Sequence, residues 1–192
     1  MIRILIVDDH PAVRSGLVAA LRSEPGLVPV AAASSMAGAV DQAERSGPDL
    51  ALVDYHLAEG DGLALCHELK RFGSAHGVVI YSAFARPELL LAAAVAGADG
   101  MVDKGAPLDD LFAAIRTVAR GGKALPPLRP EAVERSVTRL DPQDLPILGM
   151  RIDGATLPEI ASVLQLEERE LSRRVVAMLG RLAGPVRPAA SA

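Results

Sequence analysis

The chain has 192 residues, of which half are hydrophobic, 23% are charged and only 3% are aromatic, and its formal net charge is −4. This length suits one full α/β domain followed by a small second domain. The single cysteine, Cys66, excludes an internal disulfide, and the first residues resemble neither a signal peptide nor a membrane span. We therefore expect a soluble cytoplasmic protein, without a zinc site or a strongly basic domain.

Strand-like and helix-like segments alternate through the first 121 residues. Short runs rich in aliphatic and β-branched residues are each followed by a segment in which apolar residues recur at helical spacing. Five such alternations predict a five-stranded parallel, doubly wound α/β domain with helices on both faces of the sheet. The predicted strands are 2–7, 27–33, 50–53, 78–81 and 100–103, and the helices that follow them start at Pro11, Met36, Gly62, Pro87 and Leu108.

The second half of the chain has a different pattern. Three prolines between Leu125 and Pro130 predict a stiff, extended linker. Beyond it every segment has helical features: Asp141 precedes a proline, and Thr156 begins a capping-box pattern with Glu159. These features predict a first domain at 1–121, a linker at 122–136, a small all-α domain at 137–183 and a disordered tail at 184–192.

Polar residues follow four of the predicted strands at their carboxyl ends. They are Asp8 and Asp9, Asp54, Ser82 and Lys104. In an open α/β sheet these ends meet at one edge, where ligands bind. Three carboxylates repel one another unless a hard cation such as Mg²⁺ lies between them. With a hydroxyl and a lysine added, the set suits phosphoryl transfer to a carboxylate.

Each of these residues also has an ordinary structural explanation. Asp9 alone could cap the first helix, and Asp54 alone could simply end a strand. The joint placement of all five at strand carboxyl ends favours the functional interpretation. His10 and His56 flank the site, but we do not expect either imidazole to bind a metal.

Three segments carry a resemblance to a known family. The segments are LIVDDHP at 5–11, DLALVD at 49–54 and AGADGMVDK at 96–104. Together they resemble the receiver domain of the NarL/FixJ response regulators of two-component systems, over essentially all of residues 1–121. The resemblance implies that a partner histidine kinase transfers a phosphoryl group to Asp54.

The resemblance also implies roles for the neighbouring residues. Mg²⁺ would be held by Asp9, Asp54 and the backbone carbonyl of His56, with Asp8 acting through water. Ser82 and Lys104 would bind the phosphoryl oxygens, and Ser82 would move as the switch. Two positions depart from the family pattern: Met101 stands where the switch aromatic is usual, and Ala58 stands where a proline is usual.

Residues 140–182 resemble the helix-turn-helix output domain of the same family. The resemblance implies that the segment from Arg169 to Arg181 lies in the major groove of DNA. Three acids stand at its start, Ser172 and Val176 occupy positions where lysines are usual, and the family's fourth helix is missing. The arginines that could contact DNA are Arg169, Arg173, Arg174 and Arg181.

Three functions fit this sequence. The first is a transcription regulator in which phosphorylated Asp54 promotes a homodimer and frees the helical domain for DNA. The second is a signalling adaptor with a working receiver, whose helical domain binds protein or dimerises. The third, an aspartyl-phosphate phosphatase, lacks its usual Asp-x-Asp motif, so we do not expect an enzyme.

Overall fold

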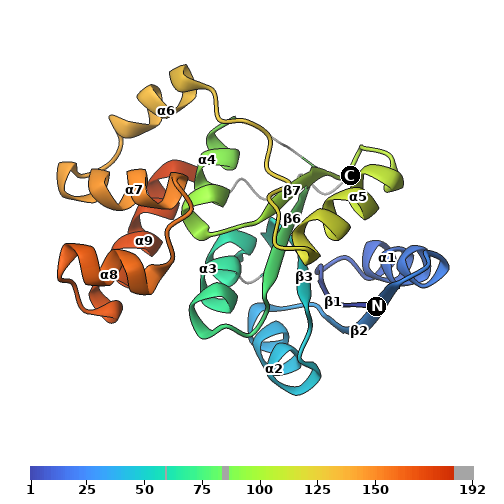
Figure 1. Ribbon diagram of the computed structural model, residues 1–192. Coiled ribbons are helices and arrows are strands. Elements are labelled where there is room, and N and C mark those ends of the chain that lie inside the picture. The colour runs from blue at the N-terminus through green and yellow to red at the C-terminus, as the bar shows by residue number, and fades with distance from the viewer. Residues whose placement is uncertain (59, 84–86, 184–192) are drawn as a thin grey trace.

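The computed structural model describes residues 1–58, 60–83 and 87–183, and its centre is a sheet of five parallel strands (Figure 1). The strand order, β2-β1-β3-β6-β7, is that of a doubly wound α/β fold. The predicted fold class is therefore confirmed. The strands are β1 (Ile2–Val7), β2 (Leu27–Ala33), β3 (Leu50–Asp54), β6 (Gly77–Ser82) and β7 (Gly100–Asp103).

Helices cover both faces of this sheet. One apolar cluster joins one face to α1 (Pro11–Ser23) and α5 (Leu108–Ala119). A second cluster joins the other face to α2 (Met36–Ser46), α3 (Gly62–Phe72) and α4 (Pro87–Ala96). Between β3 and α3 lies a small hairpin of β4 (His56–Leu57) and β5 (Gly60–Asp61), which the sequence pattern did not predict.

Side chains and glycines at the helix ends explain where most of these helices start and stop. Ser35 and Asp61 accept N–H hydrogen bonds in the first turns of α2 and α3, and left-handed glycines end both helices. Helix α1 differs from the expectation of an aspartate cap. Its N-cap is His10, which makes no side-chain capping bond, and Pro11 supplies a preorganised first turn instead.

The segment expected as a linker is only partly extended. Residues 125–129 form neither helix nor strand, whereas Pro130–Val137 is helix α6. Proline at the first position of a helix costs no hydrogen bond, so Pro130 can begin this helix as well as end the extended run. The domain boundaries remain predictions, and the tail predicted at 184–192 lies outside the described residues.

The C-terminal part is helical, as the sequence predicted. After α6 come a 3-10 turn (Pro142–Asp144), α7 (Leu145–Ile152), α8 (Leu157–Leu164) and α9 (Glu168–Ala183). The capping box of Thr156 and Glu159 is present at the start of α8, with both reciprocal bonds formed. No helix in the described ranges is long and apolar enough to cross a membrane.

The helical part packs against α4 of the α/β domain (Figure 1). After Pro87 and Glu88, helix α4 contains only leucine, alanine and valine, and seven of its ten residues are buried. A helix that is apolar all round must be covered on all sides. The sheet and α3 cover one side of α4, and α9 lies along another. Both parts of the chain therefore share one continuous apolar core.

Two buried polar contacts accompany this packing. The ring Nε2 of His67 on α3 is 2.8 Å from the hydroxyl of Ser172 on α9. The Arg151 Nε–H donates to the carbonyl of Val95 near the end of α4, also at 2.8 Å. Burial, assisted by the charges of Arg151 and Arg71, lowers the pKa of His67 from 6.5 to about 4. His67 is therefore neutral in the packed arrangement at pH 7.

We expect the packing of α9 against the α/β domain to weaken in acid. The pKa of His67 is lower in the packed state than its ordinary value. The contribution of neutral His67 to the stability of the packed state is therefore complete above pH 6.5 and is lost as the pH falls towards 4. Each pH unit in that window removes about 1.4 kcal/mol. Small-angle X-ray scattering should show a larger radius of gyration at pH 5 than at pH 7. His67→Gln, which keeps a hydrogen-bonding group but cannot titrate, should reduce this difference; an equal expansion of both proteins would contradict the assignment.

Candidate functional site

Four of the residues singled out from the sequence meet at the carboxyl end of the sheet. Asp8 and Asp9 follow β1, Asp54 ends β3, and Lys104 follows β7. Asp8 and Asp54 are buried, with 1% and 3% of their surface exposed. The five parallel strands bring these residues together from positions up to 96 apart in the sequence.

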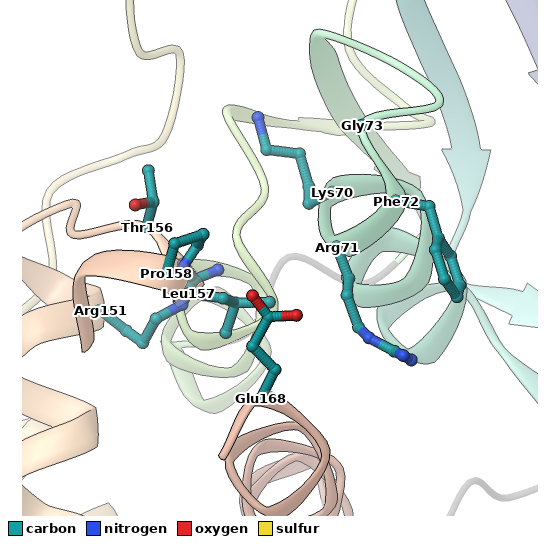
Figure 2. A pocket seen from close by; sticks show the side chains of 9 residues that line it. All are labelled: Lys70, Arg71, Phe72, Gly73, Arg151, Thr156, Leu157, Pro158 and Glu168. Carbon is teal, nitrogen blue, oxygen red and sulfur yellow. The ribbon is translucent and has the colours of Figure 1, made fainter. Parts of the chain in front are cut away.

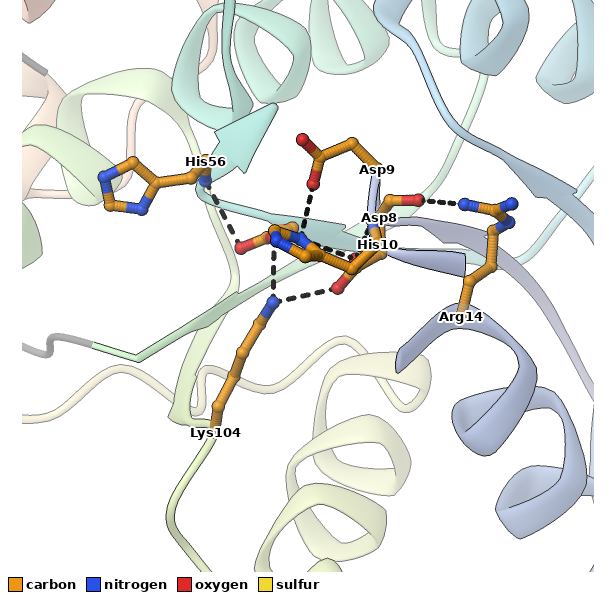
Figure 3. Close-up of polar contacts among 7 residues, drawn as sticks. Asp8, Asp9, His10, Arg14, His56 and Lys104 are labelled. Atoms are coloured by element: carbon orange, nitrogen blue, oxygen red, sulfur yellow. Dashed lines mark hydrogen bonds and ion pairs between the residues drawn. The ribbon is translucent and has the colours of Figure 1, made fainter. Parts of the chain in front are cut away.

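Lys104 lies between the two buried carboxylates. Its Nζ is 2.8 Å from Asp8 Oδ2 and 2.8 Å from Asp54 Oδ2. Backbone N–H groups donate to the other oxygens, that of His10 to Asp8 at 2.8 Å and that of His56 to Asp54 at 3.2 Å. Figure 3 shows Lys104 rising from below towards Asp8, while the imidazole of His56 points away from the cluster.

Burial and ion pairing shift the pKa values of Asp54 and Lys104 in opposite directions. Burial raises the pKa of Asp54, and the hydrogen bond and charge of Lys104 offset part of that rise. Burial alone would lower the pKa of Lys104, but its bonds to Asp54 and Asp8 outweigh burial and raise the pKa. The lysine thus stays charged, and its charge favours the ionised carboxylate that a nucleophile requires.

Asp9 has the features of a cation ligand. Its Oδ1 is buried and makes no hydrogen bond of suitable geometry among the described residues, although the ring Nδ1 of the exposed His10 lies 2.8 Å away. Ligand atoms of Asp8, Asp9, His10 and Asp54 all lie within 4.8 Å of one another. A buried carboxylate oxygen of this kind beside two more carboxylates suits a hard cation. The imidazole of His10 thus lies closer to the cluster than we expected.

The two remaining residues, Ser82 and Met101, lie on neighbouring strands. Ser82 ends β6 and is fully buried, and the Lys104 N–H donates to its carbonyl at 2.8 Å. Ser82 therefore stands at the same edge of the sheet as the carboxylates. Met101 lies opposite Ile80 within the sheet, and its side chain belongs to the apolar cluster on the α4 side.

Three further residues support the site and were missed in the sequence. Arg14 donates to the carbonyl of Asp8 at 2.6 Å, and the Tyr81 ring centroid lies 5.5 Å from Nζ of Lys104. A Cβ added at Gly62 would lie 2.0 Å from the carbonyl oxygen of Asp54, so only glycine fits there. The Asp61-Gly62 pair is a turn signal that could have indicated a close backbone approach.

The four arginines of α9 lie in different environments. Arg174 and Arg181 both reach the buried carboxylate of Asp144, at 2.8 and 3.4 Å. Arg173 is exposed and pairs with Glu170 on the same helix, and Arg169 is exposed. Two of the arginines therefore hold the helical part together, and two are open to a partner. Ser172, at one of the usual lysine positions, is bonded to His67.

Comparison with known proteins agrees with this geometry. Residues 4–116 match the model of the response regulator receiver domain. The DNA-binding transcriptional activator DevR/DosR of Mycobacterium tuberculosis is 31% identical, with 95% of this chain and 88% of that protein covered. The nitrate/nitrite response regulator NarP of Escherichia coli is also 31% identical, with 94% and 88% covered.

Solved structures share the fold. A LuxR-family two-component response regulator from Aurantimonas sp. SI85-9A1 matches with a TM-score of 0.63 and 29% identity, covering 71% of this chain and 99% of that one. RcsB from Salmonella enterica serovar Typhimurium, solved on promoter rprA, matches with a TM-score of 0.61 and 22% identity, covering 95% and 98%. The chain therefore belongs to the response regulators of two-component systems, in the NarL/FixJ family, with a receiver domain followed by a helical output region.

Proposed function

We propose that this protein is a cytoplasmic transcription regulator that accepts a phosphoryl group on Asp54 from a sensor histidine kinase. The observation that carries the proposal is the ion pair of Lys104 with Asp54, beside a second buried carboxylate and the buried Oδ1 of Asp9. Asp54 supplies the nucleophilic oxygen. Lys104 neutralises charge on the incoming phosphoryl oxygens, and the hydroxyl of Ser82 binds another of them as the switch.

Asp9, Asp54 and the backbone carbonyl of His56 would hold Mg²⁺, with Asp8 acting through water. The metal supplies charge neutralisation for phosphoryl transfer when it is bound. The buried Oδ1 of Asp9, which makes no hydrogen bond of suitable geometry among the described residues, supports a cation at this place. The N–H of His56 already binds Asp54, which fixes the loop that carries the His56 carbonyl.

Control of the output follows from the packing of α9. In the described arrangement Ser172, at a position where relatives usually carry a DNA-contacting lysine, is bonded to His67 of the receiver. DNA could reach this side of α9 only after the helix separates from α3 and α4. Phosphorylation would displace Lys104 from Asp8 or Asp54, favour the separated state and promote a homodimer. The dimer would then present two output regions to DNA.

The acceptor can be tested directly. Wild-type protein with Mg²⁺ and acetyl phosphate should gain one phosphoryl group, measured by mass spectrometry of the intact chain, and Asp54→Asn should gain none. Asp61→Asn is the matched control, because asparagine also caps a helix and the change removes a carboxylate from the same loop region. Equal labelling of Asp54→Asn and wild type would disprove the acceptor assignment.

The metal role of Asp9 gives a second test. Because Asp9 does not cap α1, Asp9→Ala should fold normally, yet the melting temperature should no longer rise with Mg²⁺ and labelling should become Mg²⁺-independent and slow. Asp41→Ala, at an exposed aspartate of α2, should respond to Mg²⁺ as wild type does. A Mg²⁺ response in Asp9→Ala equal to that of wild type would rule out this ligand.

DNA binding is the decisive test of the output. Phosphorylated protein should bind random duplex DNA in fluorescence anisotropy, more tightly than unphosphorylated protein and less tightly as salt rises. The double change Arg169→Ala and Arg173→Ala removes the two exposed arginines from each α9 and should flatten the log–log salt slope by about 1.8 per output region, or about 3.6 for the dimer. Arg174 is left in place because it pairs with Asp144.

The control removes the same charge elsewhere. Arg129→Ala with Arg139→Ala deletes two exposed arginines outside α9 and should leave the salt slope close to wild type. A phosphorylated dimer that shows no salt-dependent binding at all would contradict the transcription role. That outcome would support the adaptor, with the acidic start of α9 facing a protein partner.

A further inference from the structure

A cleft lies at the border between the receiver and the helical region, near Asp99 at the start of β7 and thus at the opposite end of the sheet from Asp54. Two adjoining cavities of about 420 and 510 Å³ share Lys70, Arg151 and Thr156 in their walls. Lys70 comes from the end of α3, whereas Arg151 and Thr156 come from α7 and the turn before α8. Each volume falls in the range of small-molecule sites. The cleft therefore has walls from both parts of the chain.

Cations outnumber acids in this cleft, although the protein as a whole is acidic. Its walls carry Lys70, Arg71, Lys123 and Arg151 against Asp99 and Glu168. Both carboxylate oxygens of Asp99 already accept hydrogen bonds. Oδ2 accepts from Lys70 and from the backbone N–H of Val78, and Oδ1 accepts from Lys123. Asp99 thus pairs with two lysines. Among the described residues, no carboxylate lies within hydrogen-bonding distance of the Arg151 guanidinium.

Arg151 is the unsatisfied group of the cleft. It is 92% buried, since 8% of its surface is exposed, and its Nε and Nη1 donate to the carbonyls of Val95 and Ala155. Its Nη2 has no partner among the described residues and lies against Gly97, where a Cβ would come within 2.1 Å. Figure 2 shows the side chain reaching from the C-terminal ribbon towards the helix that carries Lys70 and Arg71. A buried cationic donor without an acceptor is costly, and an anion beside it would remove that cost.

The larger cavity adds an apolar wall to this charged end. Leu90 of α4, Leu125, Leu128 and Ile152 also line it. Leu125 and Leu128 belong to the extended segment between the two parts of the chain. An apolar wall with a few convergent polar groups is the usual character of a ligand site.

We propose that this cleft binds a small amphipathic organic anion, with its carboxylate or phosphate on Arg151 and Lys123 and its aliphatic body along Leu90, Leu125 and Leu128. Because the walls come from both the receiver and the helical region, the ligand binds the packed arrangement more tightly than the separated one. By linkage it opposes release of α9. The site is distinct from Asp54, and binding can be measured without phosphorylation or DNA.

Isothermal titration of the full-length, unphosphorylated protein tests the site with octanoate and octyl phosphate, each below its micelle-forming concentration. We expect at least one of them to bind, at least tenfold more tightly than octanol, which lacks the charge, and than inorganic phosphate, which lacks the chain. The two anions also distinguish a carboxylate ligand from a phosphate ligand. Binding of neither anion, or equal binding of octanol, would overturn the proposal.

Variants locate the site. Arg151→Met and Lys123→Met should each weaken binding at least tenfold, whereas Arg139→Met, at an exposed arginine outside the cleft, should leave it unchanged. Lys123 is largely exposed and Asp99 keeps Lys70 in its absence, so Lys123→Met preserves the fold even if Arg151→Met disturbs the packing. Unaltered binding in Lys123→Met together with Arg151→Met would place the ligand elsewhere and refute the assignment.

Discussion

The arrangement of the receiver site depends on one partly buried cation, Lys104, that two carboxylates share. Without that cation Asp8 and Asp54, both buried, would repel each other across the ends of β1 and β3, and desolvation would favour the protonated form of Asp54. The lysine resolves this conflict while leaving Oδ1 of the outer carboxylate, Asp9, without a hydrogen bond of suitable geometry among the described residues. Lys104 therefore offsets the charge of Asp8 and Asp54, whereas the side of the site at Asp9 is open to a cation. A phosphoryl group on Asp54 would change the very contact that holds the two carboxylates together.

A second constraint links this site to the rest of the chain. Helix α4 has no polar face, so it must stay covered, and α9 supplies part of the cover. Helix α4 follows β6, the strand that ends in Ser82, and precedes β7, which carries Met101 and leads to Lys104. A movement at the ends of β6 or β7 can therefore be transmitted through α4 to the surface on which α9 lies. Met101 is buried on the α4 side, and its flexible thioether can adapt to small shifts of its neighbours.

The packing of α9 also contains weak points. His67 is buried as a neutral ring, and Arg151 is buried with one donor unsatisfied. Each of these features costs free energy in the packed state and costs less in the separated state. An interface with such costs is easier to open than a purely apolar one. Proton concentration and an anionic ligand can act on it in opposite directions, because the first disfavours neutral His67 and the second satisfies Arg151.

The sequence by itself determined the sheet, most helix boundaries and the residues gathered around Asp54. Strand runs, helical spacing and caps such as Asp61 and Thr156 are local properties, and parallel topology then brings all strand carboxyl ends to one edge. Local pattern could not reveal that Asp9 makes no capping bond to α1, and the Asp61-Gly62 turn signal could not say that the close neighbour of Gly62 is the backbone of Asp54, because both depend on how the loops approach each other. Only the tertiary structure decided that Arg174 and Arg181 hold Asp144 while Arg169 and Arg173 stay exposed. It alone placed Arg151 beside Lys70, since residues 81 positions apart meet only when α7 packs against α4.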